Sequence, residues 1–365
     1  MGQLRTRPVT TAHVLAPDSV DDPARPSGGN TYDRRQPAGL TELGWSVTLH
    51  TLPGPWPRPD AQALAALSES LAGVPDGSVV VLDGLVASCA PDVVVPAATR
   101  LRVAVLVHTP LAALLGDDAA EDVHRAELAV LSVAAAVLTT SAWTRGWLLA
   151  RYGLAEGRVH VALPGVDMAD LASGTAAGTQ LLCVAAVVPG KGHDQLVKAL
   201  AQVTEVPWRC TCVGALHLDR PFVQRVLREA QEAGIADSLH FTGPLGEQDR
   251  DTLYAAADAV VLASRFETYG LVVTEALARG LPVVATGVGG VGEALGWAPD
   301  GTRPGLLVPA GDPDAFGAAL WAWLSDADLR ARLRRSARAR RPLLAPWSVT
   351  ARRVADVLEQ AGAGA

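Results

Sequence analysis

Two glutamates eight positions apart, Glu267 and Glu275, are the side chains in this sequence best suited to hold a polyhydroxylated ligand. A carboxylate accepts hydrogen bonds from two neighbouring hydroxyl groups, one on each oxygen, as a ribose or a hexose presents them. Between the acids a helix is predicted to begin, and its first N–H groups attract a phosphate because they lack partners within the helix. The alternative is a capping acid followed by a surface acid. The residues expected to open this helix are Tyr269, Gly270, Leu271 and Val272.

Lys191 is the second candidate, in a Pro-Gly-Lys-Gly turn between a predicted strand and a predicted helix. The ammonium group of a lysine is a mobile point charge and suits a diphosphate leaving group, although a plain solvated lysine is the alternative. A glycine-rich loop at 287–292 follows a later strand. Glycine permits a positive φ and a close backbone approach, so Gly289 and Gly290 are expected near the same ligand.

The first half of the chain offers weaker candidates at the ends of predicted strands. His108 ends the strand at 103–107, where a histidine can contact a sugar hydroxyl or stabilise charge, although a lone histidine is more often structural. Asp83 follows the strand at 79–82 and is either an acceptor contact or the cap of a turn. Gly28 and Gly29 follow the first strand and allow a phosphate near the backbone, but they do not form a G-x-G-x-x-G dinucleotide motif.

Short β-branched runs alternate with helix-like segments throughout the chain, which predicts an α/β protein with parallel sheets. Two series of strands indicate two doubly wound, Rossmann-like domains, at residues 1–168 and 178–345. A last helix at about 347–361 is expected to pack back on the first domain. Ligands bind at the carboxyl ends of such strands, where the candidates lie. The predicted strands are 11–15, 46–50, 79–82, 103–107, 135–139, 159–163, 182–186, 209–213, 239–242, 260–263, 283–286 and 306–309.

The frame Phe266-Glu267-Thr268-Tyr269-Gly270, followed by Glu275, resembles the E-x7-E motif of retaining glycosyltransferases of family 4, of the actinobacterial type. The Lys191-Gly192 pair, the Gly-Gly-x-x-Glu loop at 289–293 and the glycine pair at 28–29 are similar to the family as well. The likeness is strong over residues 184–308 and fair over 11–167. It implies a GT-B fold, with two domains facing each other across a cleft, and metal-independent transfer of a hexose from a nucleoside diphosphate sugar to a hydroxyl acceptor.

The resemblance also implies a role for each candidate. The donor would place its ribose on Glu275, its diphosphate on Lys191 and the amides of 269–272, and its hexose near Glu267, Gly289 and Gly290. The base would meet backbone around Leu245, and Gly28 and Gly29 would lie beside the phosphates. Glu267 and His108 would act in catalysis, and Asp83 would contact the acceptor, which the first domain would bind.

The sequence departs from the family at Ala186, where an arginine is usual five residues before the lysine, and at Gly292, where a proline is common. One expected cation for the phosphates is therefore missing, unless another arginine replaces it. Two alternatives stay open: a sugar-nucleotide epimerase of the same fold, and a catalytically impaired protein that only binds nucleotide sugars. A covalent intermediate and a same-face transfer also both remain open.

Composition narrows the range of partners. A net charge of −7 argues against nucleic acid and against an anionic membrane as a main partner. No apolar run reaches the roughly 18–20 residues that span a bilayer, and residues 1–11 lack a secretion signal, so we expect a cytoplasmic protein. Peripheral association with a membrane is not indicated. Neither the four cysteines nor the histidines have metal-ligand spacing, and no D-x-D motif lies between strands, so we expect no metal and no cofactor besides the donor.

Overall fold

The computed structural model describes residues 10–115 and 121–363, and the chain divides into two compact units. Unit one comprises Met1–Asp22, Gly29–Gly165 and Trp347–Ala365, and unit two comprises Pro23–Gly28 and Val166–Pro346. Residues 1–9, which carry most of the expectation about a secretion signal, lie outside the described residues. Among the described residues, no helix is both long and apolar enough to cross a membrane.

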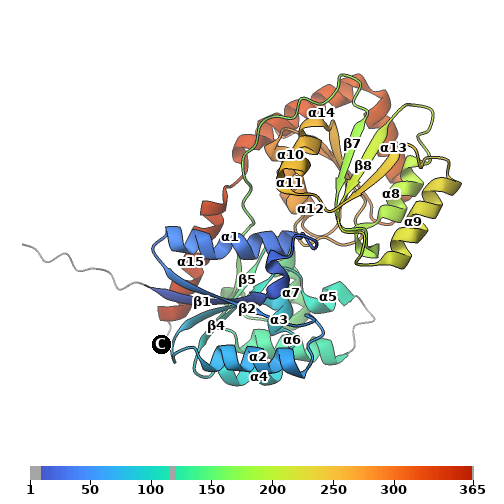
Figure 1. Cartoon of the computed structure of the whole chain (residues 1–365). Coiled ribbons are helices and arrows are strands. Elements are labelled where there is room, and N and C mark those ends of the chain that lie inside the picture. The colour runs from blue at the N-terminus through green and yellow to red at the C-terminus, as the bar shows by residue number, and fades with distance from the viewer. Residues whose placement is uncertain (1–9, 116–120, 364–365) are drawn as a thin grey trace, which may run out of the picture. The chain divides into compact units, whose positions relative to one another are not determined.

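Unit one is built on a parallel six-stranded sheet of order β2-β1-β3-β4-β5-β6 (Figure 1). Its strands are β1 (Thr11–Pro17), β2 (Ser46–Leu52), β3 (Val79–Asp83), β4 (Arg102–Val107), β5 (Ala136–Thr139) and β6 (Val159–Val161). Its helices are α1 (Gly28–Glu42), α2 (Ala61–Ala72), α3 (Gly84–Ala87), α4 (Pro91–Ala97), α5 (Leu111–Leu115), α6 (Glu121–Val133), α7 (Ala142–Tyr152) and α15 (Trp347–Ala363).

Alternate residues of each strand in unit one pack into two separate cores, because successive side chains point to opposite faces of a sheet. In β3, Val80 and Leu82 face the helices α2, α4, α6 and α7. Val79 and Val81 face α1 and α15, which cover the other side (Figure 1). Helix α15 thus completes the core of the first unit although it comes from the end of the chain.

Unit two repeats this plan with a parallel sheet of order β12-β11-β10-β7-β8-β9. Its strands are β7 (Gln180–Val184), β8 (Arg209–Val213), β9 (Leu239–Gly243), β10 (Ala259–Leu262), β11 (Val283–Thr286) and β12 (Gly305–Val308). Its helices are α8 (His193–Leu200), α9 (Arg220–Glu232), α10 (Glu247–Ala256), α11 (Leu271–Ala278), α12 (Val291–Leu295), α13 (Pro313–Ser325) and α14 (Ala327–Arg340).

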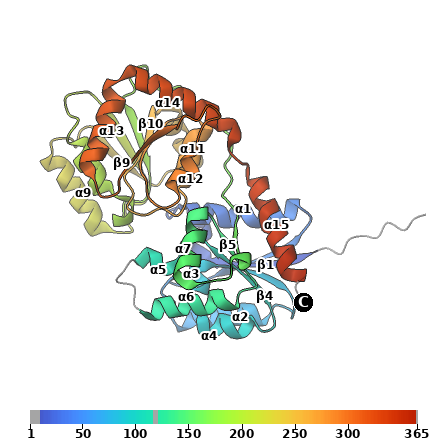
Figure 2. The ribbon, with the colours of Figure 1, turned by 180° about the vertical axis from the view of Figure 1, so that it is seen from behind.

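Helices cover both faces of the second sheet. Helices α8, α9 and α13 pack on one face, against Leu181 and Cys183 of β7 (Figure 1). Helices α10, α11, α12 and α14 pack on the other face, as Figure 2 shows from behind for α11, α12 and α14. Local sequence sets where these helices begin: Asp312 accepts a hydrogen bond from the Ala315 amide at 2.8 Å, and Pro313 opens α13.

The predicted fold class is confirmed: the chain is α/β, with two doubly wound parallel sheets. Each of the twelve predicted strands overlaps an observed one. The largest shift is at β7, which ends at Val184, so that Ala186 lies in the loop beyond the strand rather than on it.

Candidate functional site

Lys191 and Glu267, which lie 76 residues apart, meet at the carboxyl end of the second sheet. The Lys191 Nζ donates to Glu267 Oε1 at 2.6 Å, and Ser264 Oγ donates to the same oxygen at 3.0 Å. Strand β10, which leads to Glu267, is paired with β7, which leads to Lys191. Glu267 is largely buried and Lys191 is about one-third exposed. Among the described residues, nothing in the chain donates to the second oxygen, Oε2, so that oxygen remains available to a ligand.

Arg265 ties the turn that carries Lys191 to the loop that carries Glu267. The Arg265 amide donates to Gly190 O at 2.9 Å, and its guanidinium donates to Pro189 O at 2.7 Å. The guanidinium also binds both oxygens of Asp194, each at 2.7 Å. Burial of Asp194 raises its pKa, but the hydrogen bonds and charge of Arg265 outweigh burial and leave the pKa lowered. Arg265 therefore fixes the position of the lysine.

Gly289 and Gly290 pack against the backbone of the Glu267 loop. A Cβ on Gly289 would lie 1.6 Å from the Glu267 carbonyl oxygen, and Gly289 has a φ of +53°. A Cβ on Gly290 would lie 2.2 Å from Thr268 O, and the Gly290 amide donates to Glu267 O at 3.1 Å. The sequence predicted a close approach to a ligand at these glycines. Both glycines also approach the chain itself closely and so hold Glu267 in place, while their contact with a ligand stays a prediction.

Helix α11 begins at Leu271, after Gly270, whose φ of +95° only glycine adopts readily. No described residue accepts a hydrogen bond from the amides of Leu271 and Val272, so both remain available to an anion. Tyr269 was expected within the opening turn of the helix, but it precedes the N-cap. Its side chain is buried in the core, because the turn before Gly270 points it inward, and burial raises its pKa to about 12.

Glu275 lies one turn into α11 and accepts a hydrogen bond from the Tyr254 hydroxyl at 2.8 Å. Tyr254 is fully buried, which together with the charge of Glu275 raises its pKa well above the usual value, so it remains a donor. The Arg279 guanidinium stacks on the Tyr254 ring at 4.4 Å and donates to Glu275 O at 3.0 Å. The carboxylate is therefore oriented by a buried partner, as a fixed binding group requires.

His108 and Asp83 come together in unit one with Asp33, a residue that the sequence analysis missed. His108 Nε2 lies 2.7 Å from Asp33 Oδ1 and 3.7 Å from Asp83 Oδ2. Asp83 Oδ1 accepts hydrogen bonds from the amides of Leu85 and Val86, so Asp83 caps the start of α3. Its other oxygen, Oδ2, faces His108. Burial and the Asp33 charge raise the pKa of Asp83 to about 7. Burial lowers the pKa of His108, but Asp33 and then Asp83 outweigh it and raise that pKa overall.

The weaker candidates, Gly28, Gly29 and Leu245, lie in different parts of the structure. A Cβ on Gly29 would lie 3.4 Å from the His108 ring, so a side chain there would crowd the histidine, and Gly28 opens α1. Leu245 is partly buried in the loop between β9 and α10.

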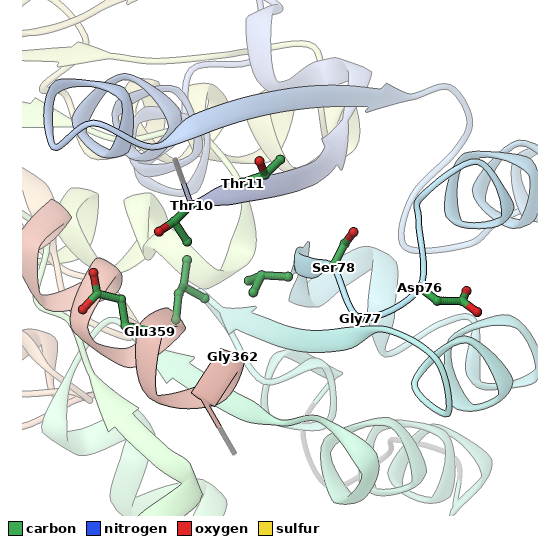
Figure 3. A pocket seen from close by; sticks show the side chains of 9 residues that line it. Thr10, Thr11, Asp76, Gly77, Ser78, Glu359 and Gly362 are labelled. Carbon is green, nitrogen blue, oxygen red and sulfur yellow. The ribbon is translucent and has the colours of Figure 1, made fainter. Parts of the chain in front are cut away.

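An open hollow of about 530 Å³ in unit one lies between Thr10, Ser78 and Glu359, at the amino ends of the strands (Figure 3). It is therefore at the opposite end of the sheet from His108.

The sequence analysis also missed a group of three residues in unit two that could bind a metal ion. Cys183, His193 and Cys212 are all buried, and their ligand atoms lie within 4.8 Å of one another. Their spacing along the chain matches no metal motif, and only the register of β7 against β8 and the start of α8 bring them together.

Comparisons with known proteins agree with this geometry. Residues 176–340 match the family model described as glycosyl transferases group 1. A protein of Salinispora tropica named D-inositol 3-phosphate glycosyltransferase is 33% identical over 242 residues, 59% of this chain and 49% of that protein. One of the same name from Kineococcus radiotolerans is 32% identical over 275 residues, 68% of this chain and 63% of that protein. The chain thus spans about half to three-fifths of these relatives' length.

Solved structures extend the likeness to both units. Sucrose-phosphate synthase from Thermosynechococcus elongatus superposes with a TM-score of 0.79 at 21% identity, covering 96% of this chain and 98% of that one. Anabaena HepE in complex with UDP-glucose gives a TM-score of 0.77 at 17% identity, covering 96% and 99%. The chain therefore has the GT-B fold, and the match of residues 176–340 to the group 1 glycosyltransferase model agrees with the resemblance to family 4.

Proposed function

We propose that this chain transfers a hexose from a nucleoside diphosphate sugar to a hydroxyl group, with retention of anomeric configuration and without a metal ion or cofactor at the donor. The observation that carries the proposal is the contact of Lys191 with Glu267 beside the open start of α11. Ammonium and free amides suit a diphosphate, and the free oxygen of Glu267 suits a sugar hydroxyl. We assign the donor to unit two and the acceptor to unit one, near His108.

The proposed transfer takes place on one face of the sugar. The bond from the anomeric carbon to the diphosphate oxygen breaks, the acceptor oxygen bonds to that carbon, and the acceptor proton passes to the departing phosphate. Lys191 stabilises the charge that develops on the phosphate. In this proposal Glu267 acts on the sugar as a fixed negative charge, which the bonds from Lys191 and Ser264 to one of its oxygens hold in place.

The relatives suggest which compounds to test first. HepE was solved with UDP-glucose, and the curated relatives are named for an inositol 3-phosphate acceptor. We therefore propose a uridine diphosphate hexose as donor and a cyclitol or its phosphate as the first acceptor class to assay. Neither these relatives nor the structures compared above are epimerases, so the epimerase alternative gains no support.

The test is a transfer assay that compares the wild type with Glu267→Gln. We expect kcat to fall about 100-fold or more because a group that acts on the transition state is lost, while UDP affinity changes little. Glu232→Gln, at the exposed end of α9, is the matched control and should behave as wild type. Added Mg²⁺ should leave the rate unchanged, and the product should keep the donor's anomeric configuration. Full activity in Glu267→Gln would refute the assignment.

Ala186 supports one further candidate, a protein that binds nucleotide sugars but transfers poorly. Adding the missing cation by Ala186→Arg distinguishes the two. If the site lacks only a positive charge, Ala186→Arg should bind UDP about tenfold more tightly than the wild type, as a charged hydrogen bond of about 1.5 kcal/mol predicts. Thr204→Arg, on an exposed loop of the same unit, is the charge-matched control. A wild type that turns over at an ordinary rate without the substitution would exclude impairment.

A further inference from the structure

The face of the second sheet that α8, α9 and α13 cover holds a cluster of sulfur and nitrogen atoms that the proposed transfer does not use. Cys183 of β7 and Cys212 of β8 are paired directly across the parallel ladder, so their side chains share one face. His193, the first residue of α8, closes over the carboxyl ends of these strands. All three residues are at most 1% exposed.

The distances suit a metal ion. Cys183 Sγ lies 3.7 Å from His193 Nε2, and the three ligand atoms lie within 4.8 Å of one another. An ion about 2.3 Å from sulfur and about 2.05 Å from nitrogen separates these atoms by about 3.6 Å at a tetrahedral angle and about 3.8 Å at a trigonal one. The observed separation falls between the two values, so the ring and the sulfur need hardly move to share an ion.

The His193 ring packs against the ring of Phe241 but has no oxygen or nitrogen partner among the described residues. The Nδ1 atom of His193 is buried without a hydrogen-bond partner, and Nε2 has only the sulfur of Cys183. A buried polar ring without an oxygen or nitrogen partner destabilises the fold, and an ion on Nε2 would supply a strong partner.

We propose that Cys183, His193 and Cys212 form a binding site for a soft, thiophilic divalent metal ion such as Zn²⁺. Two thiolates and a neutral imidazole cancel the charge of a divalent ion, which burial favours over a monovalent one. Each thiol releases its proton to solvent on binding, so affinity rises with pH. Because Nδ1 has no acceptor, we expect weaker binding than at structural zinc sites, where that nitrogen is usually hydrogen-bonded.

The site is structural and separate from the proposed transfer. His193 follows Lys191 by two residues, with only Gly192 between them. A bound ion would fasten the start of α8 to β7 and β8, and so would hold the turn that carries Lys191. The inference does not rest on the proposed function, and metal-independent transfer is compatible with it because the ion would not touch the donor.

The experiment titrates the reduced, chelator-treated full chain with Cd²⁺ and follows the ultraviolet charge-transfer absorption of cadmium thiolate. We expect saturation at one equivalent per chain. Cys212→Ser should lose the band. Cys210→Ser is the matched control, since Cys210 lies two residues away on the same strand face and is equally buried, and it should keep the band. Far-ultraviolet circular dichroism of the metal-free variants verifies their folding.

A second readout needs no variant. The ¹¹³Cd resonance of the loaded wild type should report two sulfur ligands and one nitrogen ligand. Absence of the band, a band that survives in Cys212→Ser, or a resonance typical of oxygen ligands would overturn the proposal. Loss of the band in Cys210→Ser would overturn the assigned ligand set.

Discussion

Replacing Gly289 by alanine should disable the chain through Glu267, although Gly289 is not itself expected to take part in the chemistry. The new Cβ would lie 1.6 Å from the Glu267 carbonyl oxygen, whereas real Cβ contacts stay beyond 3.0 Å, so that carbonyl must move by about 1.4 Å. The positive φ costs about 1–2 kcal/mol, and loss of the Gly290 amide bond to Glu267 costs about 1 kcal/mol more. We therefore expect Gly289→Ala to destabilise unit two by about 2–3 kcal/mol.

The same displacement predicts the effect on turnover. A catalytic group moved by about 1 Å typically loses about 100-fold in rate, so kcat should fall by at least that factor in the variant that remains folded. Gly292→Ala is the control, because it lies in α12, its Cβ would meet only Leu307 Cδ1 at 3.8 Å, and alanine favours a helix by about 0.5–1 kcal/mol. Urea unfolding and the transfer assay measure both quantities. Equal stability and equal rates in the two variants would refute this reasoning.

Two further changes test the partners of the site residues. Tyr254→Phe removes the hydroxyl that orients Glu275, and we expect UDP to bind about 3–10-fold more weakly by calorimetry, as the loss of one hydrogen bond predicts; unchanged affinity would count against Glu275 as the ribose contact. Asp33→Asn should lower the pKa of His108, followed by NMR of its ring proton, because Asp33 raises that pKa. Because the folded pKa of His108 is raised, protonated His108 stabilises the fold below pH 6.5. That stabilisation is lost as the pH rises through the folded pKa. The folded state also holds the proton of Asp83 up to a pKa of about 7, so the free energy of unfolding falls further as the pH rises from about 4 to 7. Stability should therefore depend less on pH in Asp33→Asn, and an unchanged profile would contradict the cluster.

The sequence could predict the sheets because each buried strand is a short β-branched run between turn residues. In β10 and β11 every residue is buried, as expected of parallel strands covered on both faces. Lys191 and Glu267 could be placed at the same edge because both follow strands, and parallel strands bring their carboxyl ends together. Their direct contact could not be predicted, since it requires β7 and β10 to be neighbours in a sheet whose strand order the sequence does not state.

Other parts of the site leave weak signals in the sequence. Asp33 lies on α1, one residue after the buried Tyr32, and an acid on a helix usually faces solvent. Only the fold shows that this part of α1 lies against His108. The partners of Cys183 were equally hidden, because they come from a neighbouring strand and from the start of a helix. Helix packing decides the first case and strand pairing the second, and the pattern of a single sequence shows neither.

The missing arginine at position 186 has a physical consequence for how this site holds a diphosphate. Arg265 lies beside the lysine turn, but Asp194 binds its guanidinium at two points, so its charge is largely neutralised and it does not replace the absent cation. Lys191 shares its ammonium with Glu267, which leaves two of its three donors for a phosphate. The free amides at the start of α11 must then supply a larger share of the diphosphate binding than they would in a site with a second cation. Hydrogen bonds from fixed amides depend on geometry more than on charge, and that geometry is set by Gly270 and by the glycines that pack on the Glu267 loop. The loss of one charged side chain thus makes the proposed donor site depend on backbone positions that only glycine can fill.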